Sequence, residues 1–380
     1  MNGRKEIVIT HYQERPILIY QMDNKPYDLL VGECQTADAL EVGDIFVGHV
    51  QNIVQNINAA FVEVQKGVIC YLPMSECGER KIRIGDELVV QVKKPAVKTK
   101  QAVVTLSIEL VGNYSVVTAQ DTTKRMSKKI TDEEVRCQLQ EVLHEFTDMP
   151  YGIVLRTNAA KTSIDIIRDE CKQLLSEIED MMEHSQYKSC FSRIRKADPF
   201  YMSYIRSCRP EEYDRIITDD KTIYEDLHER GIACAELYED SYSLENLLGL
   251  KSKIEKALAK RIWLKSGGNL MIEPTEALTV IDVNTGKAIE GKRNKETTFF
   301  NINCEAAKEV ARQMRLRNMS GIILVDFIDM QKKEHKNELM KLLQEELRKD
   351  KTRTALVDIT KLGLVEITRM KKNPPLWELF

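Results

Sequence analysis

The chain has 380 residues, of which 43% are hydrophobic and 30% charged, and its formal net charge is −3. At roughly 150 residues per domain, this length predicts two to three domains, each able to bury its own core. The near-neutral charge excludes a uniformly basic nucleic-acid binder, but it is compatible with local basic surfaces.

The cysteine content argues against a disulfide scaffold and against a zinc ribbon. The chain has nine cysteines, an odd number, and no CxxC pair. The N-terminal segment lacks the apolar stretch of a signal peptide, and no apolar run approaches the ~20 residues of a membrane span. We therefore expect reduced thiols in a cytoplasmic protein.

The first third of the chain is rich in short β-strand patterns. Residues 5–33 predict a small antiparallel sheet. Residues 40–108 predict five strands in about seventy residues, which fits a small OB-type barrel. Another small β-barrel or a sandwich remains the alternative. The five strand patterns are DIFVGHVQNIV, AAFVEVQ, GVICYLPM, ELVVQVKK and QAVVTLSI.

The middle of the chain mixes helical and strand patterns. The periodicity predicts a helix, a strand and a second helix, at residues 132–146, 151–157 and 169–185. Residues 200–268 are predicted to be mostly helical, including residues 245–264.

The last part of the chain carries the clearest pattern. Apolar, β-branched runs at residues 276–283 and 321–330 flank an amphipathic helix. The apolar positions of that helix recur at intervals of four, at Ile302, Ala306, Val310 and Met314. Strand, helix and strand predict an α/β unit, with a right-handed crossover if the strands are parallel. One more helix and two strands are predicted at residues 338–350, 354–360 and 363–369.

Two aspartates stand in or at the end of these apolar runs, Asp282 and Asp326. A buried, unpaired carboxylate is costly, so each needs a partner or a cation. Ligands in open α/β sheets gather at the carboxyl ends of strands, where two carboxylates would suit Mg²⁺ or Mn²⁺ rather than zinc. Asn284 shares the face of Asp282 and could orient it. Taken alone, these residues leave equally open that each Asp caps a turn or pairs with a basic residue. Asp329 is interpreted as a turn or supporting residue.

Positive charge surrounds these aspartates in the sequence. The segment GKRNK, residues 291–295, follows the first strand, and Lys308, Arg312 and Arg315 form one stripe of the predicted helix. A solvated helix face is the usual explanation of such a stripe. Beside a carboxylate–metal site, the stripe would suit a polyanionic substrate.

The predicted barrel contains two candidate stacking residues for unpaired bases, Phe61 and Tyr71. Each base–aromatic stack would contribute ~1–3 kcal/mol. Packing in the core is the usual role of aromatic residues in β-barrels, so the alternative remains open. A basic flank is formed by Lys93, Lys94, Lys98 and Lys100.

Several enzyme classes lack their motifs in this chain. The six histidines form no HxH or HExxH pattern, which argues against a zinc hydrolase. No Walker loop and no GxGxxG occurs, which argues against a nucleotide-driven motor and a dinucleotide enzyme.

Four segments of the chain carry a resemblance to a known family: TEALTVIDVNTGK, GKRN, NCEAAKEVARQMRLRNMSGIILVDFIDM and WLKSGG. With these motifs the chain resembles the ribonuclease E/G family of bacterial endoribonucleases, over residues 1 to about 375. It is similar to the ribonuclease G branch, because no long disordered tail follows the catalytic region.

The resemblance implies a multidomain α+β and α/β fold. A ribonuclease H-like domain would be discontinuous and would carry an inserted OB-fold RNA-binding barrel. A 5′-sensor region and a deoxyribonuclease I-like catalytic domain would complete the chain. In this order, the implied ranges are 1–37 with 200–268, 38–107, 108–199 and 269–380.

The resemblance also implies an activity. Asp282 and Asp326 match the family's catalytic, magnesium-binding aspartates, and Asn284 matches the asparagine that orients them. The implied reaction is magnesium-dependent hydrolysis of single-stranded, A/U-rich RNA to 5′-phosphate and 3′-hydroxyl products, in rRNA maturation or mRNA decay. A non-catalytic RNA-binding or assembly factor on the same fold is the alternative.

Two further groups of residues match family positions. The RNA-contacting positions of the barrel are matched by Phe61, Tyr71 and Lys100. The pocket that reads a 5′-monophosphate is matched by Gly112, Val116, Arg156 and Thr157, and a supporting arginine by Arg353. An arginine fork with a hydroxyl and backbone N–H groups suits a terminal phosphate.

Three departures from the family pattern qualify these expectations. The chain ends at KKNPPLWELF, without the family's zinc link and small dimerisation domain, so zinc is not expected and the oligomeric state stays open. Lys128 and Lys129 stand where arginines are common, which predicts weaker bidentate contacts. The segment GKAIEGKRN is about one residue longer than usual, which shifts the basic loop.

Overall fold

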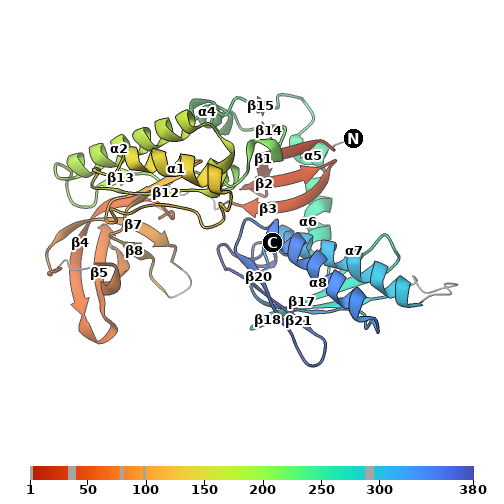
Figure 1. Ribbon diagram of the computed structural model, residues 1–380. Helices are drawn as coiled ribbons and strands as arrows, with labels where there is room; N and C mark the ends of the chain where they lie inside the picture. Colours follow the sequence, from red (N-terminus) through yellow and green to blue (C-terminus); the bar gives the residue numbers. More distant parts are fainter. Residues whose placement is uncertain (1–2, 33–39, 78–80, 97–99, 287–294) are drawn as a thin grey trace. The chain divides into compact units, whose positions relative to one another are not determined.

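The protein divides into two compact units (Figure 1). The computed structural model describes residues 3–32, 40–77, 81–96, 100–286 and 295–380. Unit 1 comprises Met1–Cys34 and Pro210–Phe380, and unit 2 comprises Gln35–Arg209. Among the helices of the described residues, none combines the length and the apolarity needed to cross a membrane.

The N-terminal sheet of unit 1 has five strands in the order β15-β14-β1-β2-β3. Strands β1, β2 and β3 are antiparallel neighbours, which confirms the small sheet predicted for residues 5–33. The other two strands run parallel to β1 and come from much later in the chain. The bounds are β1 Lys5–Tyr12, β2 Arg15–Met22, β3 Lys25–Val31, β14 Arg215–Thr218 and β15 Ala235–Leu237.

The mostly helical prediction for residues 200–268 is therefore wrong in part. Strands as short as β14 and β15 have too few residues to display a period of their own. The single helical stretch predicted for residues 245–264 is also divided. Gly249, with φ 58°, ends one helix and starts the next, and a strand follows. The elements of this region are α3 Phe200–Ile205 of unit 2 and, in unit 1, α4 Lys221–Glu229, α5 Leu244–Leu248, α6 Leu250–Leu258 and β16 Arg261–Trp263.

Unit 2 contains a closed β-barrel, as the sequence predicts. Five strands pair in the order β4-β5-β6-β8-β7, and β7 pairs back to β4. This closure is consistent with an OB-fold. The bounds are β4 Ile45–Val54, β5 Ala59–Gln65, β6 Val68–Pro73, β7 Glu87–Lys94 and β8 Val103–Thr105, with β13 Arg193–Arg195 paired to β4.

A second sheet of unit 2 has the order β11-β12-β10-β9 and packs with two helices into one apolar cluster. Both predicted helices and the predicted strand at residues 151–157 are confirmed. Asp132 caps the first helix by accepting the backbone N–H groups of Glu134 and Val135. The bounds are β9 Glu109–Val111, β10 Ser115–Thr118, β11 Lys124–Met126, β12 Gly152–Leu155, α1 Glu133–Glu145 and α2 Ile164–Ser185.

The C-terminal sheet of unit 1 has six strands in the order β16-β17-β18-β19-β21-β20. Strands β18 and β19 are parallel and connected through helix α7, which confirms the predicted α/β unit. Helices α7 and α8 lie over one face of this sheet (Figure 1) and share its apolar cluster. The bounds are β17 Asn269–Pro274, β18 Leu278–Asn284, α7 Lys295–Leu316, β19 Gly321–Asp326, α8 Lys333–Arg348, β20 Thr354–Ile359 and β21 Val365–Arg369.

The sequence predicts that the basic stripe of α7 faces solvent or a polyanionic substrate. Two of its three residues contact the protein instead, so the prediction is wrong for them. Arg312 donates to the backbone oxygen of Pro26 at 2.6 Å, and Arg315 lies 3.1 Å from Asp28. Both contacts are with strand β3, which is remote in sequence. Only Lys308 is exposed. The two arginines therefore fasten α7 to the N-terminal sheet.

Candidate active site

Asp282 and Asp326 lie side by side at the carboxyl ends of neighbouring parallel strands. The register of β18 and β19 pairs these two residues directly. Adjacent strands in a sheet lie ~4.8 Å apart. The alternate residues Ile281, Val283 and Val325 are buried in the cluster under α7. Both carboxylates therefore project from the opposite face, over which the described residues place no helix.

This face is open, which corrects the premise that each aspartate is buried in an apolar run. Asp282 is half-buried and Asp326 is exposed, because α7 and α8 cover the other face of the sheet. Partial burial of the carboxyl group and the negative charges of Asp282 and Asp329 raise the pKa of Asp326 above its usual value. Mutual repulsion of this kind favours a cation between the carboxylates.

Asn284 holds one of these carboxylates in place. Its Nδ2 donates to Oδ2 of Asp282 at 2.7 Å. The chain then turns at Gly286, where φ is 52° and a Cβ atom would lie 2.4 Å from the backbone oxygen of Gly267. Both facts require glycine at this position. In the basic segment 291–295, only Lys295 lies within the described residues; it begins α7.

Asn303 is a supporting residue that the sequence analysis missed. Its side chain is fully buried on α7 and exchanges two hydrogen bonds with the backbone of Ile328, at 2.7 and 3.1 Å. Ile328 lies between Asp326 and Asp329, so Asn303 fixes the loop that follows the exposed aspartate. A polar residue directly beside the apolar stripe of α7 was the available signal.

Glu296, at the start of α7, fixes the far end of the same loop. Its carboxylate accepts the backbone N–H groups of Gln331 and Lys332 at 3.1 and 3.0 Å. These bonds are the main reason that the pKa of Glu296 lies below its usual value, with a smaller contribution from His335. The loop after β19 is thus anchored to α7 at both ends.

The donor set at the aspartates fits a hard cation. Within residues 3–32, 40–77, 81–96, 100–286 and 295–380, no group of three or more His, Cys, Asp or Glu residues could hold a metal ion. A pair of carboxylates is nonetheless sufficient for Mg²⁺, which keeps several waters and takes further oxygens from a phosphate substrate.

The structure brings four of the five predicted phosphate-sensing residues together in unit 2. Arg156 Nη1 donates to the backbone oxygen of Gly112 at 2.6 Å. Val116 pairs with Val154 across β10 and β12. Thr157 follows Arg156, and its Oγ1 lies 3.0 Å from Oγ of Ser127.

The chain is similar to proteins named ribonuclease G and ribonuclease E. The family model described as "Ribonuclease E/G family" matches residues 109–372. Ribonuclease G of Salmonella typhimurium is 32% identical over 356 residues, which cover 87% of this chain and 73% of that protein. Ribonuclease G of Haemophilus influenzae is 32% identical, with coverage of 88% and 73%. Ribonuclease E of a Nostoc species is 30% identical over 90% of this chain, but over only 52% of its own length.

The chain belongs to the ribonuclease E/G family. The segment matched by the family model contains both aspartates, Asn284 and all five predicted sensor residues. The barrel residues Phe61 and Tyr71 precede that segment.

The structure also locates Lys128, Lys129 and Arg353, which the sequence analysis assigned to phosphate sensing. Lys128 and Lys129 are exposed and directly follow Ser127, the residue next to Thr157. Arg353 is exposed and belongs to unit 1, whereas the other sensor residues belong to unit 2. Its supporting role stays a prediction.

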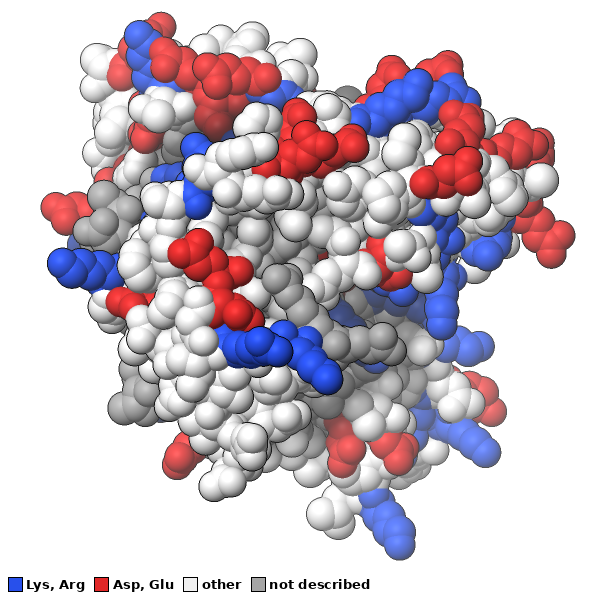
Figure 2. All heavy atoms as spheres, turned by 90° about the vertical axis from the view of Figure 1, so that its left-hand side faces the viewer, with Lys and Arg blue, Asp and Glu red and all other residues white. Residues whose placement is uncertain are grey.

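Phe61 and Tyr71 lie on the surface of the barrel and not in its core. They pair across β5 and β6, with ring centroids 6.2 Å apart, and both are half-buried. Lys100 is exposed, Lys93 is paired with Glu76 at 2.8 Å, and Lys98 lies outside the described residues. On the face drawn in Figure 2, both Lys or Arg and Asp or Glu side chains are present, in keeping with the near-neutral net charge.

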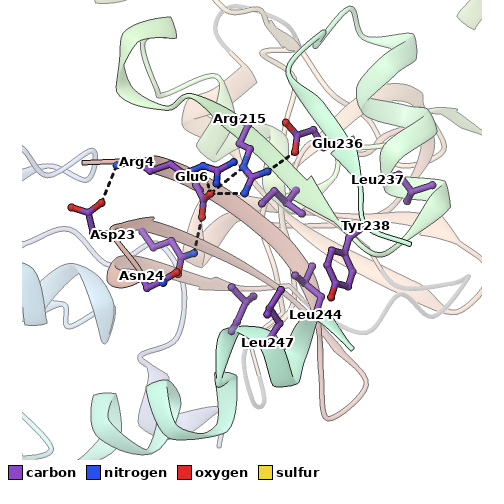
Figure 3. A pocket seen from close by; sticks show the side chains of 13 residues that line it. Arg4, Glu6, Asp23, Asn24, Arg215, Glu236, Leu237, Tyr238, Leu244 and Leu247 are labelled. Carbon is purple, nitrogen blue, oxygen red and sulfur yellow. Dashed lines mark hydrogen bonds and ion pairs between the residues drawn. The ribbon is translucent and has the colours of Figure 1, made fainter. Parts of the chain in front are cut away.

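A cavity of about 490 Å³ in unit 1 lies against the N-terminal sheet, and its lining includes neither aspartate. Four charged side chains of this lining are paired with one another, and the fifth, Asp23, accepts the backbone N–H of Arg4 (Figure 3). Arg215 donates to Glu6 at 2.7 Å and to Glu236 at 2.6 Å, and Arg4 lies 2.8 Å from Glu6. Each charged side chain of the lining therefore has a partner within the protein.

Proposed function

We propose that the protein is a magnesium-dependent endoribonuclease that hydrolyses single-stranded RNA to 5′-phosphate and 3′-hydroxyl products. Membership of the ribonuclease E/G family supports the endoribonuclease role. The observation that carries the finer proposal is the pairing of Asp282 with Asp326, in register, on the open face of one sheet.

Asp282 and Asp326 would hold the magnesium ion, or Mn²⁺ in its place, through carboxylate oxygens. The ion would supply activation of a water for attack on the phosphodiester and stabilisation of the charge that develops. Asn284 would keep Asp282 oriented through its 2.7 Å hydrogen bond. Zinc favours cysteine and histidine ligands, whereas this pair offers oxygens alone.

Each part of the structure would correspond to one of the domains that the family resemblance implies. The N-terminal sheet would form a ribonuclease H-like domain, and the C-terminal sheet a deoxyribonuclease I-like catalytic domain. The barrel would bind single-stranded RNA. The proposed setting is rRNA maturation or mRNA decay in the cytoplasm.

The barrel would contact RNA bases through Phe61 and Tyr71, together with Lys100. Replacing either aromatic residue with alanine is expected to weaken RNA binding ~5- to 100-fold, the equivalent of one lost base stack. Fluorescence anisotropy with a labelled oligonucleotide in EDTA measures this change. The exposed residue Ile84, changed to alanine, serves as the control, and an equal loss of affinity there would contradict the stacking role.

The sensor residues Gly112, Val116, Arg156 and Thr157, supported by Arg353, would receive the 5′-monophosphate of the RNA. The hydrogen bond of Arg156 to the Gly112 loop supports a common pocket. Equal cleavage rates on 5′-monophosphate and 5′-hydroxyl substrates would count against this role.

The experiment that tests the proposed activity compares cleavage of an end-labelled, A/U-rich single strand in Mg²⁺ and in EDTA. Internal cleavage is expected in Mg²⁺ alone. Tight binding without cleavage in Mg²⁺ would contradict the proposal and would favour a non-catalytic RNA-binding factor.

A further inference from the structure

The loop that joins β9 to β10 forms a cradle of backbone N–H groups, and the chain's own carboxylate fills it. Glu170, on helix α2, accepts the N–H groups of Asn113, Tyr114 and Ser115 at 2.7, 2.7 and 2.8 Å. It also accepts the Ser115 hydroxyl at 2.9 Å. Successive N–H groups that converge in this way form a typical anion-binding nest.

Gly112 allows this close approach. A Cβ atom at Gly112 would lie 2.5 Å from Oε1 of Glu170 and 2.9 Å from a methyl group of Leu174. Glycine is therefore required because of the neighbouring carboxylate and not because of its φ angle. Glu170 can occupy this position only because residue 112 has no side chain.

Arg156 binds the other side of the same loop. Its Nη1 donates to the backbone oxygens of Gly112 and Asn113 at 2.6 and 3.2 Å. Burial, the largest effect, and the nearby Arg206 lower the pKa of Arg156, whereas Glu170 acts in the opposite direction. Glu170 and Arg156 therefore both bind the loop at residues 112–115, one through its N–H groups and the other through its carbonyl oxygens.

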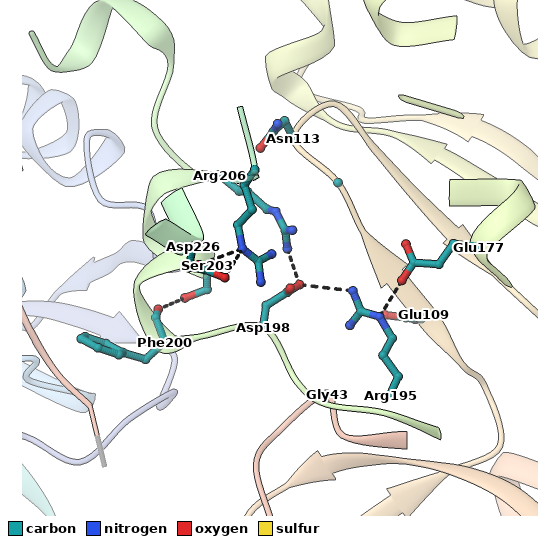
Figure 4. Close-up of polar contacts among 12 residues, drawn as sticks. Gly43, Glu109, Asn113, Glu177, Arg195, Asp198, Phe200, Ser203, Arg206 and Asp226 are labelled. Carbon is teal, nitrogen blue, oxygen red and sulfur yellow. Dashed lines mark hydrogen bonds and ion pairs between the residues drawn. The ribbon is translucent and has the colours of Figure 1, made fainter. Parts of the chain in front are cut away.

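Arg206, the second cation near Arg156, has a carboxylate partner of its own. Its Nη1 donates to Oδ2 of Asp198 at 2.6 Å, and Asp198 also lies 3.7 Å from Arg195 (Figure 4). Arg195 in turn donates to Glu177 at 2.8 Å. Glu170 therefore acts on the sensor loop itself, and the neighbouring carboxylates balance other charges.

We propose that Glu170 is a specificity-determining residue for the 5′ end of the RNA, because it competes with a 5′-phosphate for the N–H groups of residues 113–115 beside Arg156. This inference rests on the proposed 5′-end sensing. A carboxylate and a phosphate are both acceptor-only anions, and they require the same donors. A 5′-monophosphate enters only when Glu170 leaves the nest, whereas a 5′-hydroxyl gains nothing from that movement.

The test measures kcat/KM for one oligonucleotide carrying either a 5′-monophosphate or a 5′-hydroxyl, in Mg²⁺. Glu170→Gln keeps the size of the side chain and removes its charge. It is expected to raise the ratio of the two kcat/KM values at least about 5-fold, the lower end of typical coupling between two binding events. The rate on the 5′-hydroxyl substrate should stay near that of the wild type.

Two further variants serve as a charge control and as a second test of Glu170. Asp169→Asn removes an exposed charge from the adjacent position of α2 and should leave the ratio unchanged. Glu170→Ala empties the nest and should raise the ratio as Glu170→Gln does. Thermal unfolding of each variant verifies that it is folded.

The outcomes separate the inference from the function on which it rests. If Arg156→Ala lowers the wild-type ratio but Glu170→Gln and Glu170→Ala leave it unchanged or lower it, sensing stands and Glu170 merely orders the loop. If the ratio is one in the wild type and in every variant, the proposed sensing fails, and the inference with it. If neither substrate is cleaved, the proposed nuclease activity fails.

Discussion

Replacing Asp282 or Asp326 with asparagine is expected to lower the rate of RNA cleavage by ~10³-fold or more, because several kcal/mol of transition-state stabilisation would be lost with the cation. The two residues are paired in register on an open sheet face, so neither supports the apolar core. Single-turnover cleavage of a labelled single strand measures the effect.

The same variants should still bind RNA, because the proposed binding surface of the barrel is unchanged. Asp358→Asn, which alters an exposed carboxylate on β20 of the same sheet, is the matched control and should cleave at nearly the wild-type rate. Wild-type cleavage by Asp282→Asn or Asp326→Asn would overturn the assignment of the site.

Asn303→Ala is expected to lower both stability and activity. The substitution leaves the backbone N–H and C=O groups of Ile328 without their partner, at a cost of ~2–4 kcal/mol in the free energy of unfolding. The loop between Asp326 and Asp329 would then lose its position, and kcat is expected to fall ~10- to 100-fold. Urea unfolding and steady-state cleavage measure the two effects.

Asn301→Ala is the matched control for this prediction, because Asn301 is exposed on the same helix two positions earlier. Its stability should lie within ~0.5 kcal/mol of the wild type, as is usual for exposed positions. If both alanine variants behave alike, the proposed role of Asn303 is wrong.

The C-terminal α/β unit was predictable because its pattern is local. Alternation of Asp282 and Asn284 with buried residues, and the four-residue period of α7, are visible in single segments. The pairing of Asp282 with Asp326 then follows from parallel neighbouring strands. The prediction erred on burial, since periodicity does not reveal whether helices cover one face of a sheet or both.

The features that escaped prediction depend on contacts between distant segments. β14 and β15 join a sheet whose other strands lie near residue 1. Arg312 belongs to a helix stripe that the sequence predicts to be solvated, but it contacts the backbone of Pro26. Glu170 reaches a loop that is 55 to 57 residues away. No local pattern distinguishes such a carboxylate from an ordinary exposed one.

The chemistry of the product ends tests the central proposal most directly. A single-stranded, A/U-rich oligonucleotide is incubated with the wild type in Mg²⁺ or EDTA, and with Asp326→Asn in Mg²⁺. We predict internal cleavage by the wild type in Mg²⁺ alone, with a 5′-phosphate on the downstream fragment and a 3′-hydroxyl on the upstream one. Products with a 5′-hydroxyl and a 2′,3′-cyclic phosphate, or equal cleavage by Asp326→Asn, would contradict metal-assisted hydrolysis at the aspartate pair.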